Sequence, residues 1–195
     1  ISRAKKHIEW LKSKYPNVSS VLINLDNTYN TFVDSVPNNG SDKYDLSLAN
    51  TRSRLRMVTL YYFAAINNFI VAGTGNKVED FGVGFYTKYG DGGVDISPIA
   101  DLLKSEVFEL AKHHMIIEEI IKAKPTDGLW SDNRTDEEQI GATYDELEKA
   151  MQQESKSDLN LSQRERKVMD IFKSLNSSNK HKMIPIPVCK IPKDY

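Results

Sequence analysis

Cysteine is almost missing from this sequence, because Cys189 is the only one among 195 residues. An internal disulfide needs two cysteines, so the chain cannot be a small secreted fold cross-linked by disulfides, and a zinc site built from several cysteines is excluded as well. Long apolar runs are missing too. No segment approaches the roughly 18–20 consecutive apolar residues that span a bilayer, and no signal peptide is visible. We therefore expect a cytoplasmic protein that is not bound to a membrane.

An excess of charge of one sign is a third absence. Lys and Arg number 26 against 27 Asp and Glu, which gives a formal net charge of −1. This balance provides no general attraction to nucleic acid or to an anionic membrane, so we expect neither as a partner. Any anionic ligand needs a local cluster of Lys and Arg. The length and the 39% of hydrophobic residues are typical of one globular domain with a sizeable core, which we place at residues 1–195.

Hydrophobic periodicity predicts an α/β fold in the first half of the chain. Apolar residues recur at helical spacing over 4–15, a short helix is expected around 32–36, and a longer helix is expected over 48–66. Two short aliphatic runs, 20–26 and 69–74, predict buried strands. The order strand, helix, strand favours parallel pairing with helices on both faces of the sheet.

The second half is predicted to be helical. Thr135, Thr143 and Ser162 are each followed three positions later by Glu, which is the pattern of a capping box at a helix N-terminus. Residues 106–113 are expected to form a further helix. The segment 183–192 contains three prolines, so we expect it to be extended.

Three arginines lie close together in the sequence TRSRLRM. Arg52 and Arg56 are four residues apart and share a helix face, whereas Arg54 points elsewhere. A planar guanidinium group makes two charge-assisted hydrogen bonds to a phosphate or carboxylate at once, so these residues are candidates for binding an anion. Surface arginines are common, and we expect at least one of the three to be only solvated.

The sequence AGTGNKVED, residues 72–80, directly follows the second predicted strand. In open α/β sheets, ligands bind beyond the carboxyl ends of the strands. Thr74 offers a hydroxyl group there, and Glu79, about one helical turn later, is a candidate ligand for a cation. The alternative is a plain strand-to-helix turn that contains a glycine and a capping residue.

A glycine-rich stretch, FYTKYGDGGVDISPI, is the most specific feature of the sequence. Its glycines at positions 90, 92 and 93 allow the backbone to bend where side chains would clash. Lys88 before the bend can project a positive charge into a cleft, and Asp95 after it can accept hydrogen bonds from a sugar or an amide. Lys104 lies at the start of the next predicted helix, where its ammonium group adds to the positive helix end. The alternative is a glycine turn with helix-capping aspartates.

The histidines indicate little chemistry. His113 and His114 are adjacent and face different ways on a helix, so they make a poor pair of metal ligands. His7 and His181 are isolated in the sequence, and the residues alone favour surface or hydrogen-bonded side chains. No Ser/His/Asp or Cys/His arrangement can be recognised from the spacing, so no catalytic nucleophile is assigned.

Seven motifs occur in a characteristic order along the chain: TRSRLRM, AGTGNKVE, FYTKYGDGGVDISPI, LLKSEVFELAK, KPTDGLW, TDEEQIGATYDEL and NKHKMIP. In this order the chain closely resembles the ammonia-dependent NAD synthetases, over residues 4–187, and the glycine-rich stretch favours the ammonia-dependent form. The resemblance implies a Rossmann-like adenine-nucleotide α-hydrolase fold, in which helices flank a parallel sheet. It also implies a homodimer.

The activity implied by the resemblance is the ATP-dependent amidation of deamido-NAD with ammonia. The nicotinic carboxylate attacks the α-phosphate of ATP, which gives an acyl-adenylate and pyrophosphate, and ammonia then displaces AMP. No protein nucleophile is needed, in agreement with the spacing. By matching motif, the residues expected to contact deamido-NAD are Arg54, Lys88, Asp95, His181 and Lys182; those expected to contact ATP are Thr74, Lys104 and Thr126; and Glu79 is expected to help ligate Mg²⁺.

One motif of the family is not found. Its members carry a Ser-Gly-Gly-x-Asp-Ser loop for the ATP pyrophosphate after their first strand, and the aspartate of that loop is a further magnesium ligand. In the family this strand and loop precede the position at which Ile1 stands. The resemblance thus implies a fold that is N-terminally incomplete, with an apolar patch exposed where a core strand is lacking. We expect this polypeptide alone to be inactive in NAD formation.

Two alternatives stay open. The chain could belong to another amide-forming ligase of the ATP pyrophosphatase type, in which case deamido-NAD would not stabilise it more than other carboxylates do. It could also be a non-catalytic nucleotide-binding module of the same fold, which would bind nucleotides without turnover. For the NAD synthetase interpretation, we expect residues 125–134 and the C-terminal tail to close on the substrate.

Overall fold

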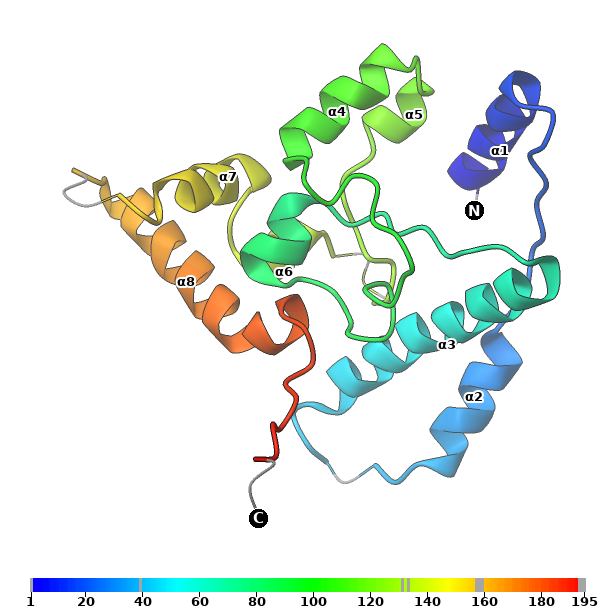
Figure 1. The fold of residues 1–195 in the computed structure, drawn as a ribbon, viewed down its shortest axis with the longest axis horizontal. Coiled ribbons are helices and arrows are strands. Elements are labelled where there is room, and N and C mark those ends of the chain that lie inside the picture. Colours follow the sequence, from blue (N-terminus) through cyan, green and yellow to red (C-terminus); the bar gives the residue numbers. More distant parts are fainter. Residues whose placement is uncertain (1, 39, 131, 133, 157–159, 193–195) are drawn as a thin grey trace.

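The computed structural model describes residues 2–38, 40–130, 132, 134–156 and 160–192. The regular elements of these residues are nearly all helical, and Figure 1 shows them arranged around a central region of irregular loops. In chain order they are α1 (Ser2–Lys14), α2 (Asp26–Ser35), α3 (Tyr44–Asn67), the π-helix η1 (Val78–Val83), α4 (Lys104–His113), α5 (Glu118–Ile121), α6 (Asp136–Ile140), α7 (Tyr144–Gln153) and α8 (Gln163–Met183).

The main hydrophobic core lies where η1, α7 and α8 meet (Figure 1). Phe172 of α8 and Leu147 of α7 are 1% and 0% exposed, and Val78 and Val83 at the two ends of η1 are fully buried beside them. Full burial of a side chain of this kind contributes about 1.5–3 kcal/mol to stability. The core therefore fixes η1, and with it Glu79, against α7 and α8.

The long helix α3 packs through one narrow face. Ala49, Ser53 and Met57, spaced four residues apart, are buried on that face. Two of these side chains are small, so the backbone of a neighbouring loop can approach the helix closely. Gly90 lies so near that a Cβ added to it would stand 2.3 Å from Ser53 Oγ. The face of α3 thereby positions the glycine-rich stretch.

The two predicted strands do not form a sheet within the described residues. Segment 20–25 has no regular structure, and segment 69–74 takes part in one isolated bridge, in which Ala72 pairs in parallel with Ile96. The expected burial is wrong for several side chains, since Leu22 is 76% exposed and Phe69 is 68% exposed. Aliphatic composition sets a local tendency to be extended, but a strand also needs neighbouring backbone to pair with and neighbouring side chains to cover it.

The predicted capping boxes are confirmed. The side chains of Thr135, Thr143 and Ser162 each accept a hydrogen bond from the backbone N–H three residues later, at the N-termini of α6, α7 and α8. Each such cap stabilises its helix by about 1 kcal/mol. The predicted extended segment 183–192 is shorter than expected, because Met183 is the last residue of α8, and residues 184–192 have no regular secondary structure.

The described residues contain no helix that is both long and apolar enough to cross a membrane. Residues 125–134 and the C-terminal tail were expected to close on the substrate. Within these two segments, residues 131, 133 and 193–195 lie outside the described residues.

Candidate active site

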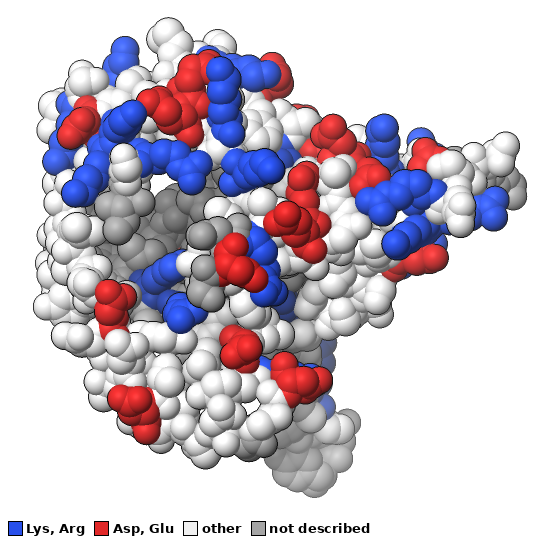
Figure 2. Space-filling view, turned by 180° about the vertical axis from the view of Figure 1, so that it is seen from behind, with Lys and Arg blue, Asp and Glu red and all other residues white. Residues whose placement is uncertain are grey.

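A cavity of about 580 Å³ lies beside α3, η1, the start of α4 and the segment that leads to α6. Figure 2 shows that one face of the molecule is hollowed, with Lys and Arg side chains around and within the hollow and Asp and Glu side chains nearby. Five of the residues expected to bind substrates or metal line the cavity: Thr74, Glu79, Lys104, Thr126 and Lys182. These residues come from distant parts of the sequence, so the fold brings them together.

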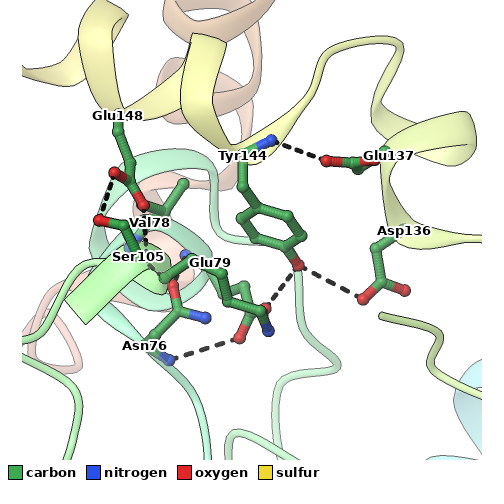
Figure 3. Close-up of polar contacts among 9 residues, drawn as sticks. Asn76, Val78, Glu79, Ser105, Asp136, Glu137, Tyr144 and Glu148 are labelled. Carbon is green, nitrogen blue, oxygen red and sulfur yellow. Dashed lines mark hydrogen bonds and ion pairs between the residues drawn. The ribbon is translucent and has the colours of Figure 1, made fainter. Parts of the chain in front are cut away.

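A cation, a carboxylate and a phenol hold one another at one wall of the cavity. Lys104 is the first residue of α4, and its Nζ lies 2.9 Å from Glu79 Oε1. The side chains of Lys104 and Glu79 are only 19% and 15% exposed. Tyr144 Oη donates a hydrogen bond to the same Glu79 oxygen at 2.5 Å (Figure 3), and the Tyr144 ring centre lies 4.7 Å from Lys104 Nζ. These contacts restrict all three side chains to one arrangement.

Asp136, the first residue of α6, adds a second carboxylate to this group. Its Oδ2 lies 3.3 Å from Tyr144 Oη (Figure 3), and its Oδ1 is buried without a hydrogen-bond partner among the described residues. Burial raises the pKa of Asp136 to about 6, and the Glu79 carboxylate adds to the rise. Burial, followed by Glu79, also raises the pKa of Tyr144 above its usual range. The phenol therefore stays protonated, and its O–H donates a hydrogen bond to Glu79, the nearer acceptor.

A buried carboxylate from α7 holds the N-terminus of α4. Glu148 is 8% exposed, and its two carboxylate oxygens accept hydrogen bonds from Ser105 N at 2.9 Å and Ser105 Oγ at 2.8 Å (Figure 3). The carboxylate of Glu106 accepts another from Leu103 N at 2.7 Å. Negative charge is favourable at a helix N-terminus. The two glutamates thus stabilise the backbone that carries Lys104.

The glycine-rich stretch bends where side chains would collide, as predicted. An added Cβ on Gly90 would lie 2.3 Å from Ser53 Oγ, and one on Gly92 would lie 2.2 Å from Cδ2 of Tyr86. Neither glycine has a positive φ, so close approach, and not backbone freedom, requires them. Asp91 between them accepts a hydrogen bond from Ser53 Oγ at 2.7 Å. These contacts hold the bend against α3.

The expected deamido-NAD residues near the end of α8 form a chain of contacts. Arg54 Nε donates to the carbonyl of Lys88 at 3.2 Å, and Lys88 Nζ donates to the carbonyl of His181 at 2.7 Å. Lys182 Nζ donates to the carbonyl of Tyr86 at 2.8 Å, and burial lowers the pKa of Lys182. The end of α8 is thereby fastened to the glycine-rich stretch. Arg54, Lys88 and His181 lie outside the cavity lining.

Asp95 also lies outside the cavity lining. Its Oδ2 accepts a hydrogen bond from Val71 N at 2.7 Å, and its Oδ1 accepts one from Tyr61 Oη at 3.1 Å. The carboxylate therefore joins α3 to segment 69–74 next to the Ala72 bridge.

Residues 125–130, which we name the cavity loop, form a further wall of the cavity. Thr126 Oγ1 donates to the carbonyl of Arg134 at 3.1 Å and accepts from Gly128 N at 3.3 Å. Gly128 has a φ of +60°, a value that glycine adopts without strain. The hydroxyl of Thr126 therefore stabilises the turn of the cavity loop through hydrogen bonds to its backbone and to that of Arg134.

Comparison with known proteins decides the family. A family model described as NAD synthase matches residues 3–185. The chain belongs to the NAD synthase family. Relatives named NH(3)-dependent NAD(+) synthetase include that of Carboxydothermus hydrogenoformans, 45% identical over 133 residues (68% of this chain, 54% of the relative), and that of Mycoplasma genitalium, 41% identical over 165 residues (84% of this chain, 62% of the relative). The chain thus spans between about half and two thirds of the length of these relatives.

Two solved structures resemble this NAD synthase family member in fold. The NMN synthetase from Francisella tularensis superposes with a TM-score of 0.79 at 31% identity, covering 98% of this chain and 72% of that one. The NH3-dependent NAD synthetase from Campylobacter jejuni, in complex with a nitrate ion, gives a TM-score of 0.64 at 24% identity, covering 86% and 64%. The second likeness concerns the fold alone. Both agree with an adenine-nucleotide α-hydrolase fold.

Sequence reasoning missed three residues of this family member's site: Asp136, Tyr144 and Glu148. Asp136 and Tyr144 are each the first residue after a cap that the sequence does predict, Thr135 and Thr143. A residue directly after a cap begins the helix, and its side chain can contact the segment that lies next to the helix N-terminus. The signal existed, but it did not indicate which helix end would approach the cavity.

The residues present fit a magnesium ion only in part. Among the described residues, no group of three or more His, Cys, Asp or Glu side chains could hold a metal. Glu79 offers a carboxylate that is bonded to Lys104 and Tyr144, and Asp136 offers a buried oxygen. Mg²⁺ is often held by one or two carboxylates together with substrate phosphates. The site therefore suits an ion that arrives with a triphosphate.

Proposed function

We propose that this chain supplies the substrate-binding part of an enzyme that amidates deamido-NAD to NAD with ammonia and ATP, the last step of NAD biosynthesis. The observation that supports this most is the meeting of Thr74, Glu79, Lys104 and Thr126 at one cavity, in a chain of the NAD synthase family. The name of the relatives, NH(3)-dependent NAD(+) synthetase, supports ammonia as the nitrogen donor.

In the proposed reaction the nicotinic carboxylate attacks the α-phosphate of ATP. A carboxylate oxygen bonds to phosphorus, the bond to pyrophosphate breaks, and negative charge grows on the leaving group. Lys104 would stabilise that charge through its ammonium group, and Thr74 and Thr126 would hold ATP in line. Ammonia then attacks the acyl carbon, AMP leaves with the bonding electrons, and the new amide loses a proton. No protein nucleophile takes part.

The contacts to deamido-NAD would come from Arg54, Lys88, Asp95, His181 and Lys182. Arg54 uses Nε for the carbonyl of Lys88, and its terminal nitrogens make no hydrogen bond within the described residues. These nitrogens present the forked donor set that suits a phosphate of the dinucleotide. Lys88 and Lys182 both bond backbone carbonyls across the glycine-rich stretch and α8, so these cations are held close to that surface.

Further parts of the proposal concern the ion, the assembly and the location. Glu79 would hold Mg²⁺, which when bound would neutralise charge on the triphosphate.

A homodimer is supported by α3, on which Val58, Tyr62 and Ile66 share one face and are 67%, 60% and 58% exposed. We also propose that residues 1–195 act as one domain and that the protein is cytoplasmic.

The likeness to an NMN synthetase supports a second candidate with the same chemistry. In that case the amidated substrate would be the mononucleotide counterpart of deamido-NAD, without its adenylate half. The cavity and the residues that contact ATP would have the same role for either substrate. Only the residues assigned to deamido-NAD would make different contacts.

Thermal unfolding with added ligands tests both candidates. A ligand at one hundred times its dissociation constant stabilises the folded state by about 2.7 kcal/mol. We expect Mg-ATP and deamido-NAD each to stabilise the chain, Lys104→Met to abolish the effect of Mg-ATP, and Lys88→Met to abolish that of deamido-NAD. Lys149→Met, at an exposed position of α7, is the matched control.

The outcomes separate the candidates. Stabilisation by nicotinic acid mononucleotide but not by deamido-NAD favours the second candidate, and stabilisation by neither contradicts both. Release of AMP by the full-length protein distinguishes an enzyme from a non-catalytic binding module.

A further inference from the structure

Two arginines of α3 bind the backbone of the cavity loop. Arg52 Nη1 donates a hydrogen bond to the carbonyl of Leu129 at 2.5 Å. Arg56 Nη1 donates to the carbonyl of Asp127 at 3.3 Å, and Arg56 Nη2 donates to that of Gly128 at 3.0 Å. Three consecutive carbonyls of the loop therefore accept hydrogen bonds from one face of one helix.

The guanidinium group suits this task better than an ammonium group does. Arg52 Cζ lies over the ring of Tyr29 in α2, 4.3 Å from the ring centre, while Nη1 of the same guanidinium donates to the loop. Arg56 presents two terminal nitrogens to two neighbouring carbonyls. A lysine at either position has the same charge but carries all its donors on one nitrogen of a flexible chain.

The other hydrogen bonds that leave the cavity loop reach α6 and Arg134. Asp136 N of α6 donates to the carbonyl of Pro125 at 3.2 Å, and Gln139 Nε2 of α6 donates to Asp127 Oδ2 at 3.2 Å. Leu129 is 9% exposed, and its N–H donates to Asp127 Oδ1 at 2.9 Å. Among the described residues, only the two arginines link the loop to α3 through hydrogen bonds. Without them, the hydrogen bonds of the described residues attach the loop only to α6 and, through Thr126 Oγ1, to the carbonyl of Arg134.

We propose that Arg52 and Arg56 are positioning residues, which hold the cavity loop against α3 so that Thr126 lines the cavity before any ligand binds. This inference rests on the proposed function, because Thr126 is the residue through which the loop would contact ATP. The two arginines need no contact with substrate themselves. A loop that is already in place loses less conformational entropy when ATP binds, so the arginines raise the affinity for ATP.

Hydrogen exchange of the ligand-free chain tests the holding role. We expect the amide of Leu129 to exchange about tenfold faster in Arg52→Lys and in Arg56→Lys, and about a hundredfold faster in the double variant, because each substitution replaces a rigid, charge-assisted guanidinium donor by a flexible ammonium group. Arg166→Lys is the matched control, since Arg166 Nε also donates to a backbone carbonyl, that of Leu161 at 3.1 Å, away from the cavity. Unchanged exchange of the amides in α8 shows that the fold is intact.

A second variant removes the ring and leaves both arginines. Tyr29→Leu should speed the exchange of the Leu129 amide by less than Arg52→Lys does, because the hydrogen bond to the Leu129 carbonyl persists while its orientation is less restricted. Exchange of Leu129 that stays unchanged in the double arginine variant overturns the holding role.

Binding of Mg-ATP separates this inference from the proposed function. We expect the double variant to bind Mg-ATP about tenfold more weakly, and saturating Mg-ATP to restore slow exchange of the Leu129 amide. Equal affinity in the double variant and the unsubstituted chain overturns the positioning role. If the unsubstituted chain fails to bind Mg-ATP while the double variant still exchanges faster, the proposed function fails and the holding role stands.

Discussion

Glu148 allows the link between α7 and α4 to be tested by substitution. Its carboxylate accepts two hydrogen bonds from Ser105 while being 8% exposed. Glu148→Ala removes both, and hydrogen bonds to a charged group contribute about 1.5–3 kcal/mol. Ser105 itself is exposed, so water satisfies its freed donors, and we expect a loss near the lower end, about 2 kcal/mol. The free energy of unfolding is measured by urea denaturation at a constant m-value.

The glutamine variant makes this test specific. In Glu148→Gln the amide oxygen still accepts from Ser105 N, the amide nitrogen can donate to Ser105 Oγ, and only the charge at the helix N-terminus is lost. The expected cost is about 0.5 kcal/mol. Glu154→Ala, at the exposed C-cap of α7, is the matched control and should change stability by less than about 0.5 kcal/mol. A glutamine variant as unstable as the alanine variant would refute the hydrogen-bonding argument.

Three further perturbations follow from the core, the glycine-rich stretch and an ion pair. Phe172→Ala removes a side chain that is 1% exposed, and urea unfolding should show a loss of about 3–5 kcal/mol. Gly92→Ala places a Cβ 2.2 Å from a tyrosine ring carbon, and the same assay should show a loss of about 1–3 kcal/mol. The Arg164 guanidinium lowers the pKa of Glu146 from 4.5 to about 2, so this pair stabilises the fold above pH 4.5 and its contribution is lost as the pH falls toward 2. Unfolding midpoints measured across that range should fall less in Glu146→Gln than in the unsubstituted chain.

Helix starts and helix faces could be predicted because their causes lie within a few residues. Thr143 needs only Glu146 three positions later to form its capping box, and both belong to one turn. In the same way, a spacing of four places Arg52 and Arg56 on one face, and both do bind the same loop. The position of Lys104 as the first residue of α4 also follows from local sequence.

Local sequence could not predict that the two aliphatic runs form no sheet within the described residues, or that Asp136, Tyr144 and Glu148 join the site, because both depend on segments distant in sequence. The run 69–74 is aliphatic enough for a strand, yet only Ala72 finds a bridge partner, and Phe69 is exposed. Tyr144 reaches Glu79 across 65 positions of sequence, and no pattern near either residue indicates that contact. The anion-binding interpretation likewise overlooked, for Arg52 and Arg56, the commonest acceptor in any protein, the backbone carbonyl.

Helix α3 holds two loops of the site through arginines that donate hydrogen bonds to backbone carbonyls. Arg54 donates to the glycine-rich stretch, while Arg52 and Arg56 donate to the cavity loop, and the two directions arise because residues two apart lie on different helix faces. Every residue has a carbonyl, so these hydrogen bonds do not depend on the side chains of the residues that accept them. The donor side of each attachment is therefore specified by α3, whereas Gly90 and Gly92 are still required by close approach. Replacing Arg54 by lysine should loosen the glycine-rich stretch alone and leave the cavity loop in place, since the two attachments share a helix but no contact.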